Sequence, residues 1–294
     1  MKKIIPGNSF DKRFSMKKIL LAIDGKNINM PALDFACYLG RLTNSKITGV
    51  FLENLVAEER PVLKSMYGGK YLDWEVDVNS PEYKVKEQTI EKNILFFKEA
   101  CERRCVNSSI HRDRGVPARE MIHESRYADL LVIDSATSFN KRYEGSPTEF
   151  VRDLLQDAEC PVIIAPESFD ELDEIIFTYN GSRSSVFAIK QFSYLLPQLS
   201  NKKATIIQVN KDGEWVNVDK YNFKEWLQYH YSSVEFEILK GETDDQLFGH
   251  LLKRKNSFIV MGAYGRSSVS RFFKHSQADL LIKTITQPIF ISHY

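Results

Sequence analysis

Short apolar runs alternate with amphipathic stretches along most of the chain. The run 19–23 is continuously apolar, which is typical of a strand covered on both faces. Directly after it, Ala32, Phe35 and Leu39 recur at helical spacing. In the first part of the chain the pattern predicts strands at 18–24, 46–52, 109–112, 130–133 and 161–165, and helices at 31–42, 82–104, from 117, and at 148–158. The stretch 55–81 is interpreted as irregular, and as either a lid or an interaction loop.

The second part of the chain repeats the same order of elements. It predicts strands at 175–179, 204–209, 234–239, 258–261 and 289–292, and helices at 182–196, at 221–230, from 243, and from near Ser276. Alternating strands and helices predict parallel sheets covered by helices on both faces. The repeat, at a period of roughly 150 residues, indicates a duplication. We therefore expect two tandem doubly wound α/β domains, 1–167 and 168–294, with residues 1–16 as a loose arm.

Composition and charge exclude several classes of protein. The formal net charge is +1, so neither nucleic acid nor an anionic membrane is an expected partner. The chain has no apolar run of eighteen residues and no apolar segment typical of a signal peptide near its start. The four cysteines fit a reducing cytoplasm. Cys101 and Cys105 are one helical turn apart, and we interpret both as buried structural thiols, because no other His or Cys pair completes a zinc pattern.

A glycine-containing segment follows the fourth strand of the second half. In open parallel sheets, ligands bind outside the carboxyl ends of the strands. Gly262 and Gly265 permit close approach of the backbone to a phosphate, and Arg266 adds positive charge. The predicted helix near Ser276 would offer free N–H groups to the same anion. These residues alone leave open a tight turn with a solvated basic loop.

The spacing of this segment resembles the universal stress protein family, which carries Gly-x2-Gly-x9-Gly-Ser/Thr after its fourth strand. The first strands of the two halves end at 22–25 (Ala-Ile-Asp-Gly) and 178–182 (Thr-Tyr-Asn-Gly-Ser), as in that family. The halves also close alike, with Cys-Pro-Val-Ile-Ile at 160–164 and Gln-Pro-Ile-Phe-Ile at 287–291. The resemblance covers nearly the whole chain after residue 16. It implies an adenine nucleotide alpha hydrolase-like, Rossmann-like fold in each half.

The resemblance also implies a ligand, ATP or AMP with Mg, in the second half. Gly262, Gly265 and Ser276 would contact phosphate, while Asn180 stands where the family has an Asp at the adenosine end. His275 replaces the third glycine of the family pattern, and it would either crowd the phosphates or donate a hydrogen bond to one. The candidate nucleotide-binding residues are Asn180, Val209, Met261, Gly262, Gly265, Arg266, His275 and Ser276.

The first half departs further from the family pattern. Its fourth strand is followed by Asp-Ser-Ala-Thr at 134–137, with neither glycine, and Asp134 would repel phosphate. We expect no nucleotide in this half, although Asp24 is present at the end of the first strand. The resemblance further implies that the halves pair through their last strands, 160–165 against 288–292. A homodimer and a protein partner are further expectations.

The leading interpretation is a cytoplasmic stress-response protein with ATP or AMP as a regulatory ligand. A slow ATPase or a nucleotidyl transferase is the alternative, although no residues stand out as a catalytic base or a metal-carboxylate cluster. A ligand-free interaction module is the third hypothesis, favoured by His275 and by the incomplete motif of the first half. The aromatic residues at 221–231 are interpreted as core packing or as a cover between domains.

Overall fold

A computed structural model of the chain describes residues 16–67, 69–140, 142–169, 171–215, 220–241, 243–263 and 286–293. The strands of the first half are β1 (Lys18–Asp24), β2 (Lys46–Asn54), β3 (Arg60–Met66), β4 (Gly69–Glu75), β5 (Ser108–Gly115), β6 (Leu130–Ile133) and β7 (Val162–Ile164). Its helices are α1 (Met30–Thr43), α2 (Pro81–Arg103), α3 (Pro117–Ser125) and α4 (Glu149–Asp157), with a 3₁₀ turn η2 (Val56–Glu58). Most predicted bounds agree with these to within a few residues.

The second half follows the same alternation. Its described strands are β8 (Glu174–Thr178), β9 (Lys203–Asn210), β10 (Ser233–Lys240), β11 (Ser257–Ala263) and β12 (Ile289–His293). Its described helices are α5 (Arg183–Leu195), α6 (Lys220–His230) and α7 (Thr243–Leu251), with a 3₁₀ turn η3 (Pro197–Leu199). The helix predicted from near Ser276 lies outside the described residues.

Local sequence explains where several helices begin. The side chains of Asn29, Ser80, Thr148 and Ser182 accept hydrogen bonds from backbone N–H groups in the first turns of α1, α2, α4 and α5. Such caps satisfy donors that a helix leaves unpaired at its start. In α1, α2 and α3 a proline also occupies the first turn, where its missing N–H costs nothing.

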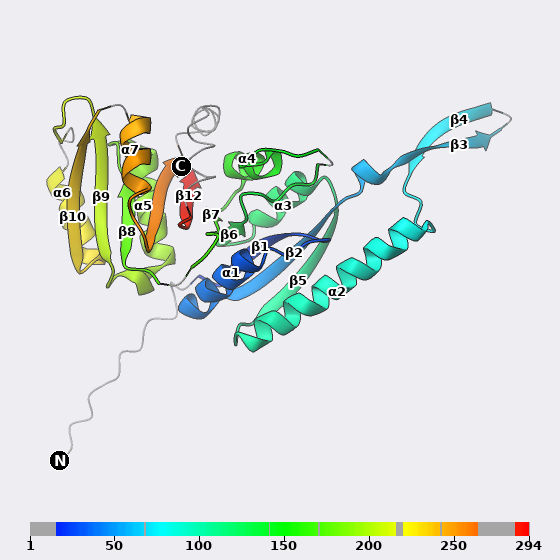
Figure 1. Ribbon diagram of the computed structural model, residues 1–294, viewed down its shortest axis with the longest axis horizontal. Coiled ribbons are helices and arrows are strands. Elements are labelled where there is room, and N and C mark those ends of the chain that lie inside the picture. The colour runs from blue at the N-terminus through cyan, green and yellow to red at the C-terminus, as the bar shows by residue number, and fades with distance from the viewer. Residues whose placement is uncertain are drawn as a thin grey trace, which may run out of the picture.

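One ten-stranded sheet runs through both halves, in the order β10-β9-β8-β11-β12-β7-β6-β1-β2-β5 (Figure 1). Neighbouring strands are parallel within each half. The halves meet where β12 pairs antiparallel with β7, aligning Ile289 with Ile164 and Phe290 with Ile163. The predicted pairing of the last strands is therefore confirmed. The division of the chain at residue 167 stays a prediction.

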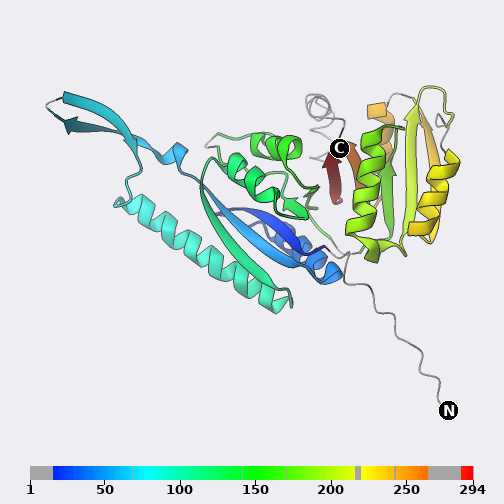
Figure 2. The same ribbon diagram turned by 180° about the vertical axis from the view of Figure 1, so that it is seen from behind.

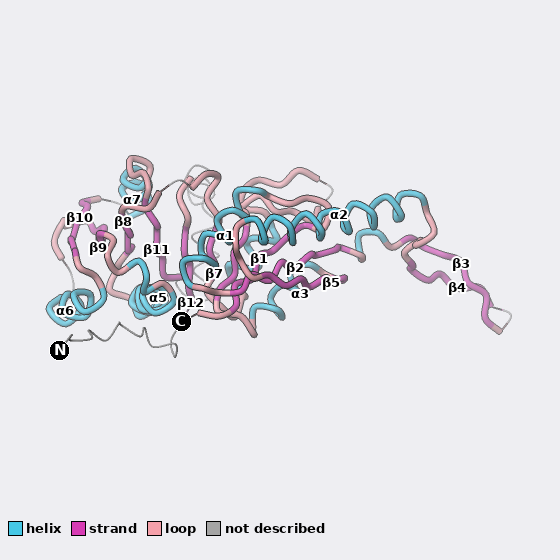
Figure 3. Tube along the Cα trace, turned by 90° about the horizontal axis from the view of Figure 1, so that it is seen from below, coloured by secondary structure: helices cyan, strands magenta, loops and turns pink. Residues whose placement is uncertain are grey.

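Helices cover both faces of this sheet, as the view from below shows (Figure 3). One apolar cluster contains residues of α1, α2, α5 and α6, and the other contains residues of α3, α4 and α7. The first cluster continues from one half to the other, because Phe35 of α1 contacts Phe258 of β11 with ring centroids 6.0 Å apart. The predicted doubly wound α/β class is confirmed. Among the described helices, none combines the length and apolar character that a bilayer crossing needs.

Two local expectations are wrong. The stretch 55–81 is not irregular throughout, because β3 and β4 form an antiparallel hairpin that projects past α2 (Figure 2). Cys105 is exposed rather than buried, since α2 ends at Arg103 and Cys105 adopts a φ of 55° beyond it. Cys101 is buried as expected, with its Sγ 4.0 Å from the Sγ of Cys37.

The aromatic residues of the segment 221–231 divide into two groups. Phe223 and Tyr231 are buried in the core, as expected for packing residues. Tyr221 and Tyr229 are 77% and 81% exposed, so they cover neither the sheet nor the other half.

Candidate functional site

Three adjacent parallel strands of the second half end at one edge of the sheet. The strand order β9-β8-β11 brings together Asn180 after β8, Val209 near the end of β9, and Met261 and Gly262 near the end of β11. Parallel sheets hold ligands at this edge. Half of the sequence-derived candidates are therefore neighbours along the edge. The other four, Gly265, Arg266, His275 and Ser276, lie outside the described residues.

Asn180 is held in a tight turn before α5. Its Oδ1 accepts a hydrogen bond from the backbone N–H of Ser182 at 3.0 Å, and Gly181 adopts a φ of 78° that suits glycine. Ser182 in turn accepts the N–H of Ser185 at 3.1 Å and caps the helix. Asn180 is exposed, so its amide group can reach a ligand above the edge while its carbonyl oxygen fixes the turn.

Gly262 is required by packing. A Cβ at this position would lie 2.6 Å from the backbone C and O atoms of Ser184 and from the Cα of Ser185. Side-chain carbons do not approach backbone atoms that closely. The glycine therefore lets the first turn of α5 lie directly against the end of β11. The sequence pattern predicted either phosphate contact or a tight turn at Gly262, and not this close packing against α5.

Val209 and Met261 form an apolar part of the edge. Both are partly buried and pack against the apolar cluster that α7 covers, together with Leu239 and Phe248. Gly262, one residue along β11, contacts α5 instead. The candidates thus lie on both sides of the sheet at its edge, with apolar side chains on one side and a tight backbone turn on the other.

An aromatic stack lies next to Asn180. The Tyr179 ring is parallel to those of Phe223 and Trp215, with centroids 4.6 Å and 5.5 Å apart and interplanar angles of 18° and 9°. The indole Nε1 of Trp215 is buried and has no hydrogen-bond partner among the described residues. A buried donor without a partner is costly, and it is satisfied when a ligand or water accepts from it. No pattern in the sequence singled out Trp215.

The corresponding edge of the first half contains a cavity of about 180 Å³. Asp24 lies in its wall, and its Oδ1 accepts the backbone N–H of Lys26 at 3.1 Å. Burial raises the pKa of Asp24, and the N–H of Lys26 and the nearby ammonium groups only partly offset this. Glu53, Glu58 and Lys86 line the same cavity. Charged side chains of the protein itself therefore surround the space.

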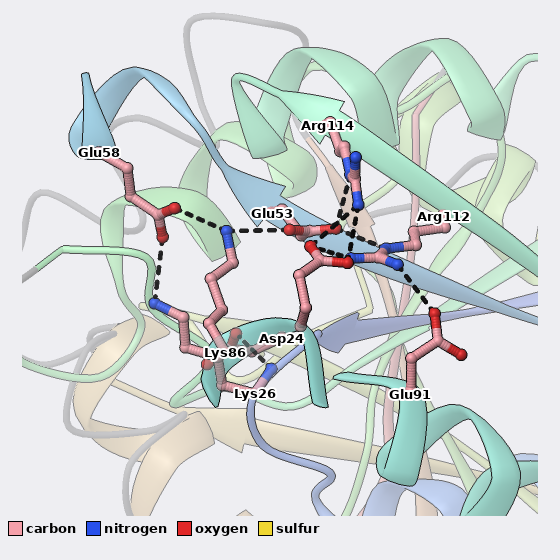
Figure 4. A network of polar contacts seen from close by, with 9 residues as sticks. Asp24, Lys26, Glu53, Glu58, Lys86, Glu91, Arg112 and Arg114 are labelled. Carbon is pink, nitrogen blue, oxygen red and sulfur yellow. Dashed lines mark hydrogen bonds and ion pairs between the residues drawn. The ribbon is translucent and has the colours of Figure 1, made fainter. Parts of the chain in front are cut away.

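These side chains form a continuous ionic network (Figure 4). Lys86 Nζ lies 2.9 Å from Glu53 Oε2 and 2.7 Å from Glu58 Oε2. Glu53 Oε1 also accepts from the Nε atoms of Arg112 and Arg114, at 2.6 Å and 3.1 Å. The side chain of Glu53 is 1% exposed. Burial opposes the ionisation of Glu53, but Arg112, Lys86 and Arg114 together hold its pKa below the ordinary value.

Asp134 lies at the end of β6, where the sequence predicted repulsion of phosphate. Burial raises the pKa of this carboxyl, and hydrogen bonds from the Ala136 backbone and the Asn29 side chain partly oppose that rise. Among the described residues, no cluster of histidine, cysteine and carboxylate side chains is arranged to hold a metal ion.

Comparisons with known proteins identify the fold. No protein-family model matches the sequence, and no curated protein matches it significantly. Among solved structures, a universal stress protein from Archaeoglobus fulgidus DSM 4304 is 19% identical, with 95% of this chain and 97% of that chain covered and a TM-score of 0.68. The chain has the fold of universal stress proteins. The resemblance inferred from the sequence motifs is thereby confirmed at the level of the fold.

Two further structures share this universal stress protein fold across both halves. A protein described as a universal stress protein, from Pseudomonas aeruginosa UCBPP-PA14, is 12% identical, covering 95% of this chain and 93% of that chain at a TM-score of 0.56. A protein of unknown function from Pseudomonas aeruginosa PAO1 is also 12% identical, covering 95% and 92% at a TM-score of 0.55. Sequence identities this low establish similarity of the fold alone.

The residues of the ionic network at the first-half edge of this universal stress protein fold were not predicted from the sequence. Part of the signal is present in the chain, because Glu53 follows an apolar strand directly and Arg112 and Arg114 alternate at strand spacing. The position of Lys86 carries no such sequence signal, since a lysine in a helix is usually solvated. Only the packing of α2 against β2 and β5 brings its ammonium group to Glu53.

Proposed function

We propose that the chain is a cytoplasmic universal stress protein that binds ATP or AMP in its second half as a regulatory ligand. One observation carries the proposal: the ends of β8, β9 and β11 bring Asn180, Val209 and Gly262 to a single sheet edge. The fold shared with universal stress proteins supports it. The chemistry of this edge supports the proposal too, because it combines an amide group, apolar side chains and a glycine backbone that a ligand can approach closely.

The contacts at this edge support a division of roles. The exposed amide of Asn180 suits the polar edge of adenine or ribose, since an amide both donates and accepts hydrogen bonds. Val209 and Met261 offer apolar surface to the base. The indole N–H of Trp215, which has no hydrogen-bond partner within the described part of the chain, adds a donor on the α5 side. The resemblance assigns the phosphates to Gly262, Gly265 and Ser276, with Arg266 and His275 beside them and Mg bound alongside ATP.

The first half supports the proposal by contrast. Its cavity of about 180 Å³ is smaller than the roughly 300 Å³ at which small-molecule pockets usually begin. The two lysines in its wall, Lys26 and Lys86, are already paired with Glu53 and Glu58, so they offer little attraction to a phosphate chain. We therefore propose that this half binds no nucleotide and acts as scaffold.

A reciprocal exchange of one residue between the halves tests the proposal. Asn180→Asp restores the carboxylate of the family pattern, and its oxygen can still accept the N–H of Ser182. Asp24→Asn makes the opposite change in the first half. We expect Asn180→Asp to change the affinity for ATP and AMP at least about fivefold by calorimetry, while Asp24→Asn leaves it unchanged.

Identification of any nucleotide that remains bound through purification completes the test. Retained ATP or AMP that stays intact over hours with Mg supports a regulatory ligand. Steady turnover of ATP would favour the slow ATPase instead. If no nucleotide is retained and none binds at millimolar concentration, the ligand-free interaction module replaces this proposal.

A further inference from the structure

The hairpin of β3 and β4 projects from the body of the molecule beyond the end of α2 (Figures 1 and 3). Its two strands pair with one another and belong to a sheet of their own. Isolated two-stranded hairpins are marginally stable in water unless a further layer packs on them. The exposed large apolar side chains of the hairpin are Val62, Leu63, Met66, Tyr67, Tyr71, Leu72 and Trp74.

The register of the hairpin separates two faces. One is called the charged face because it carries the ion pairs, although Val62, Met66 and Tyr71 also lie on it, and the other is called the apolar face. On the charged face Lys64 pairs with Asp73, at 2.7 Å, and with Glu75. These charges compensate each other, so this face can remain in water. On the opposite face Pro61 is aligned with Trp74 and Leu63 with Leu72.

The apolar face is open to solvent along its length. Leu63, Leu72 and Trp74 are 60%, 67% and 61% exposed. Contiguous apolar surface of this kind usually marks a place where another surface binds. Lys70, near the tip, is the single charged residue on this face among the described residues 60–67 and 69–75.

The base of the hairpin is fixed to the body. Glu58, two residues before β3, lies 2.7 Å from Lys86 of α2 and 3.4 Å from Lys26 after β1. Ser80, after β4, caps the start of α2. A surface presented on a fixed base loses less entropy on binding than a free loop.

We propose that the apolar face of this hairpin binds the same face of a second copy of the chain. The face is self-complementary under a two-fold axis. When the two hairpins pack antiparallel, the leucines at the centre meet each other. Lys70 near the tip of each hairpin then lies over the Trp74 ring at the base of the other, which is a favourable cation–π arrangement. Because each face supplies both the cation and the aromatic ring at matching distances from its centre, the arrangement favours a second copy over an unrelated protein.

Sedimentation of the full chain tests the proposal with two neighbouring substitutions. The wild-type chain should sediment at twice its mass of 34.0 kDa at micromolar concentration. Leu72→Glu should weaken the dimer by roughly a hundredfold, because each dimer buries the substituted position twice. Tyr71→Glu is the matched control, since Tyr71 is adjacent, exposed and on the charged face. The thermal unfolding of both variants should match that of the wild type.

Cross-linking gives a second, independent measurement. In a Cys105→Ser background, Leu72→Cys should form a disulfide between two copies, with diamide taking up the two electrons and two protons of the thiols. Tyr71→Cys should not. The proposal is overturned if the wild type sediments as a monomer at about 100 µM, a concentration at which a stable dimer is populated. It is also overturned if the dimer survives Leu72→Glu, or if Tyr71→Glu disrupts the dimer equally.

Discussion

The two halves of the chain place their most buried ion pairs at opposite ends of their strands. In the first half, Glu53 and its cationic partners close the carboxyl edge, where ligands of such sheets bind. In the second half, Glu174 begins β8 and pairs with Lys203 at 3.5 Å and Arg254 at 3.4 Å, at the amino edge. The carboxyl edge thus carries an ionic network in the first half, whereas the described candidate residues at that edge of the second half are uncharged.

The two halves therefore differ in the side chains at the ends of their strands and not in the order of the strands. In the first half, a carboxylate with three cationic partners occupies this edge beside the cavity of about 180 Å³. In the second half, the described candidate groups at the corresponding edge are the amide of Asn180, the backbone at Gly262 and the apolar side chains of Val209 and Met261. Four substitutions would break or sharpen this comparison.

The largest effect is expected for Glu53→Leu. The change leaves Lys86 and Arg112 without their buried partner, which should lower the free energy of unfolding by about 3 kcal/mol. Because the folded pKa of Glu53 is depressed, the loss should be present in full above its ordinary value of 4.5 and shrink as the pH falls through the folded pKa. Urea unfolding from about pH 3 to about pH 7, a range that brackets the ordinary pKa of a glutamate, measures the loss and its pH dependence.

The matched control for Glu53 is Glu91→Gln. Glu91 pairs with the same Arg112 at 3.1 Å but is 62% exposed. Its loss should cost less than about 0.5 kcal/mol, as for other surface pairs. Equal losses for the two variants would mean that burial does not set the strength of this network.

A smaller loss is expected for Gly262→Ala. The added Cβ meets the backbone of α5 at 2.6 Å, so the free energy of unfolding should fall by about 2 kcal/mol. Gly249→Ala in α7 is the control, because nothing lies within 4 Å of its Cβ and alanine favours helix. A Gly262→Ala variant that lost nucleotide binding but kept its stability would show that the glycine serves phosphate rather than packing.

A gain of stability is expected for Asp24→Asn at neutral pH. Burial raises the folded pKa of Asp24, so its ionised form destabilises the fold as the pH rises above the ordinary value of 3.8. The asparagine oxygen can still accept the N–H of Lys26. The unfolding temperature of the variant should exceed that of the wild type at about pH 7. Well below the ordinary pKa, the two unfolding temperatures should be alike. A loss at neutral pH would contradict the burial penalty.

The smallest effect is expected for Trp215→Phe. The change removes a buried indole N–H without a described partner but keeps an aromatic ring beside Tyr179, so stability should change by less than about 1 kcal/mol. If this N–H donates to the nucleotide, affinity should fall by roughly fivefold in calorimetric titration. Trp226→Phe is the control, since Trp226 stacks on His230 at the end of the same helix that carries Phe223.

Much of the candidate site was predictable and much was not. Asn180, Val209 and Gly262 could be placed at one edge from strand order alone, because the carboxyl ends of parallel strands meet there. The Glu53 network could not, since Lys86 is 33 positions away along the chain (86 minus 53) and nothing local marks the pair. The hairpin at 60–75 carried a double glycine near its turn, yet its strands lack an apolar run that would identify them.

The sequence by itself determined the described elements of this protein apart from the β3–β4 hairpin. Apolar runs, helical spacing, and capping residues such as Asn29 and Ser182 act over a few residues, so they can be found without the fold. Only the tertiary structure decided which edge of the sheet is closed by ion pairs, why Gly262 must be glycine, and which face of the hairpin is bare. The reason is physical: burial, desolvation and close packing depend on neighbours that are distant along the chain.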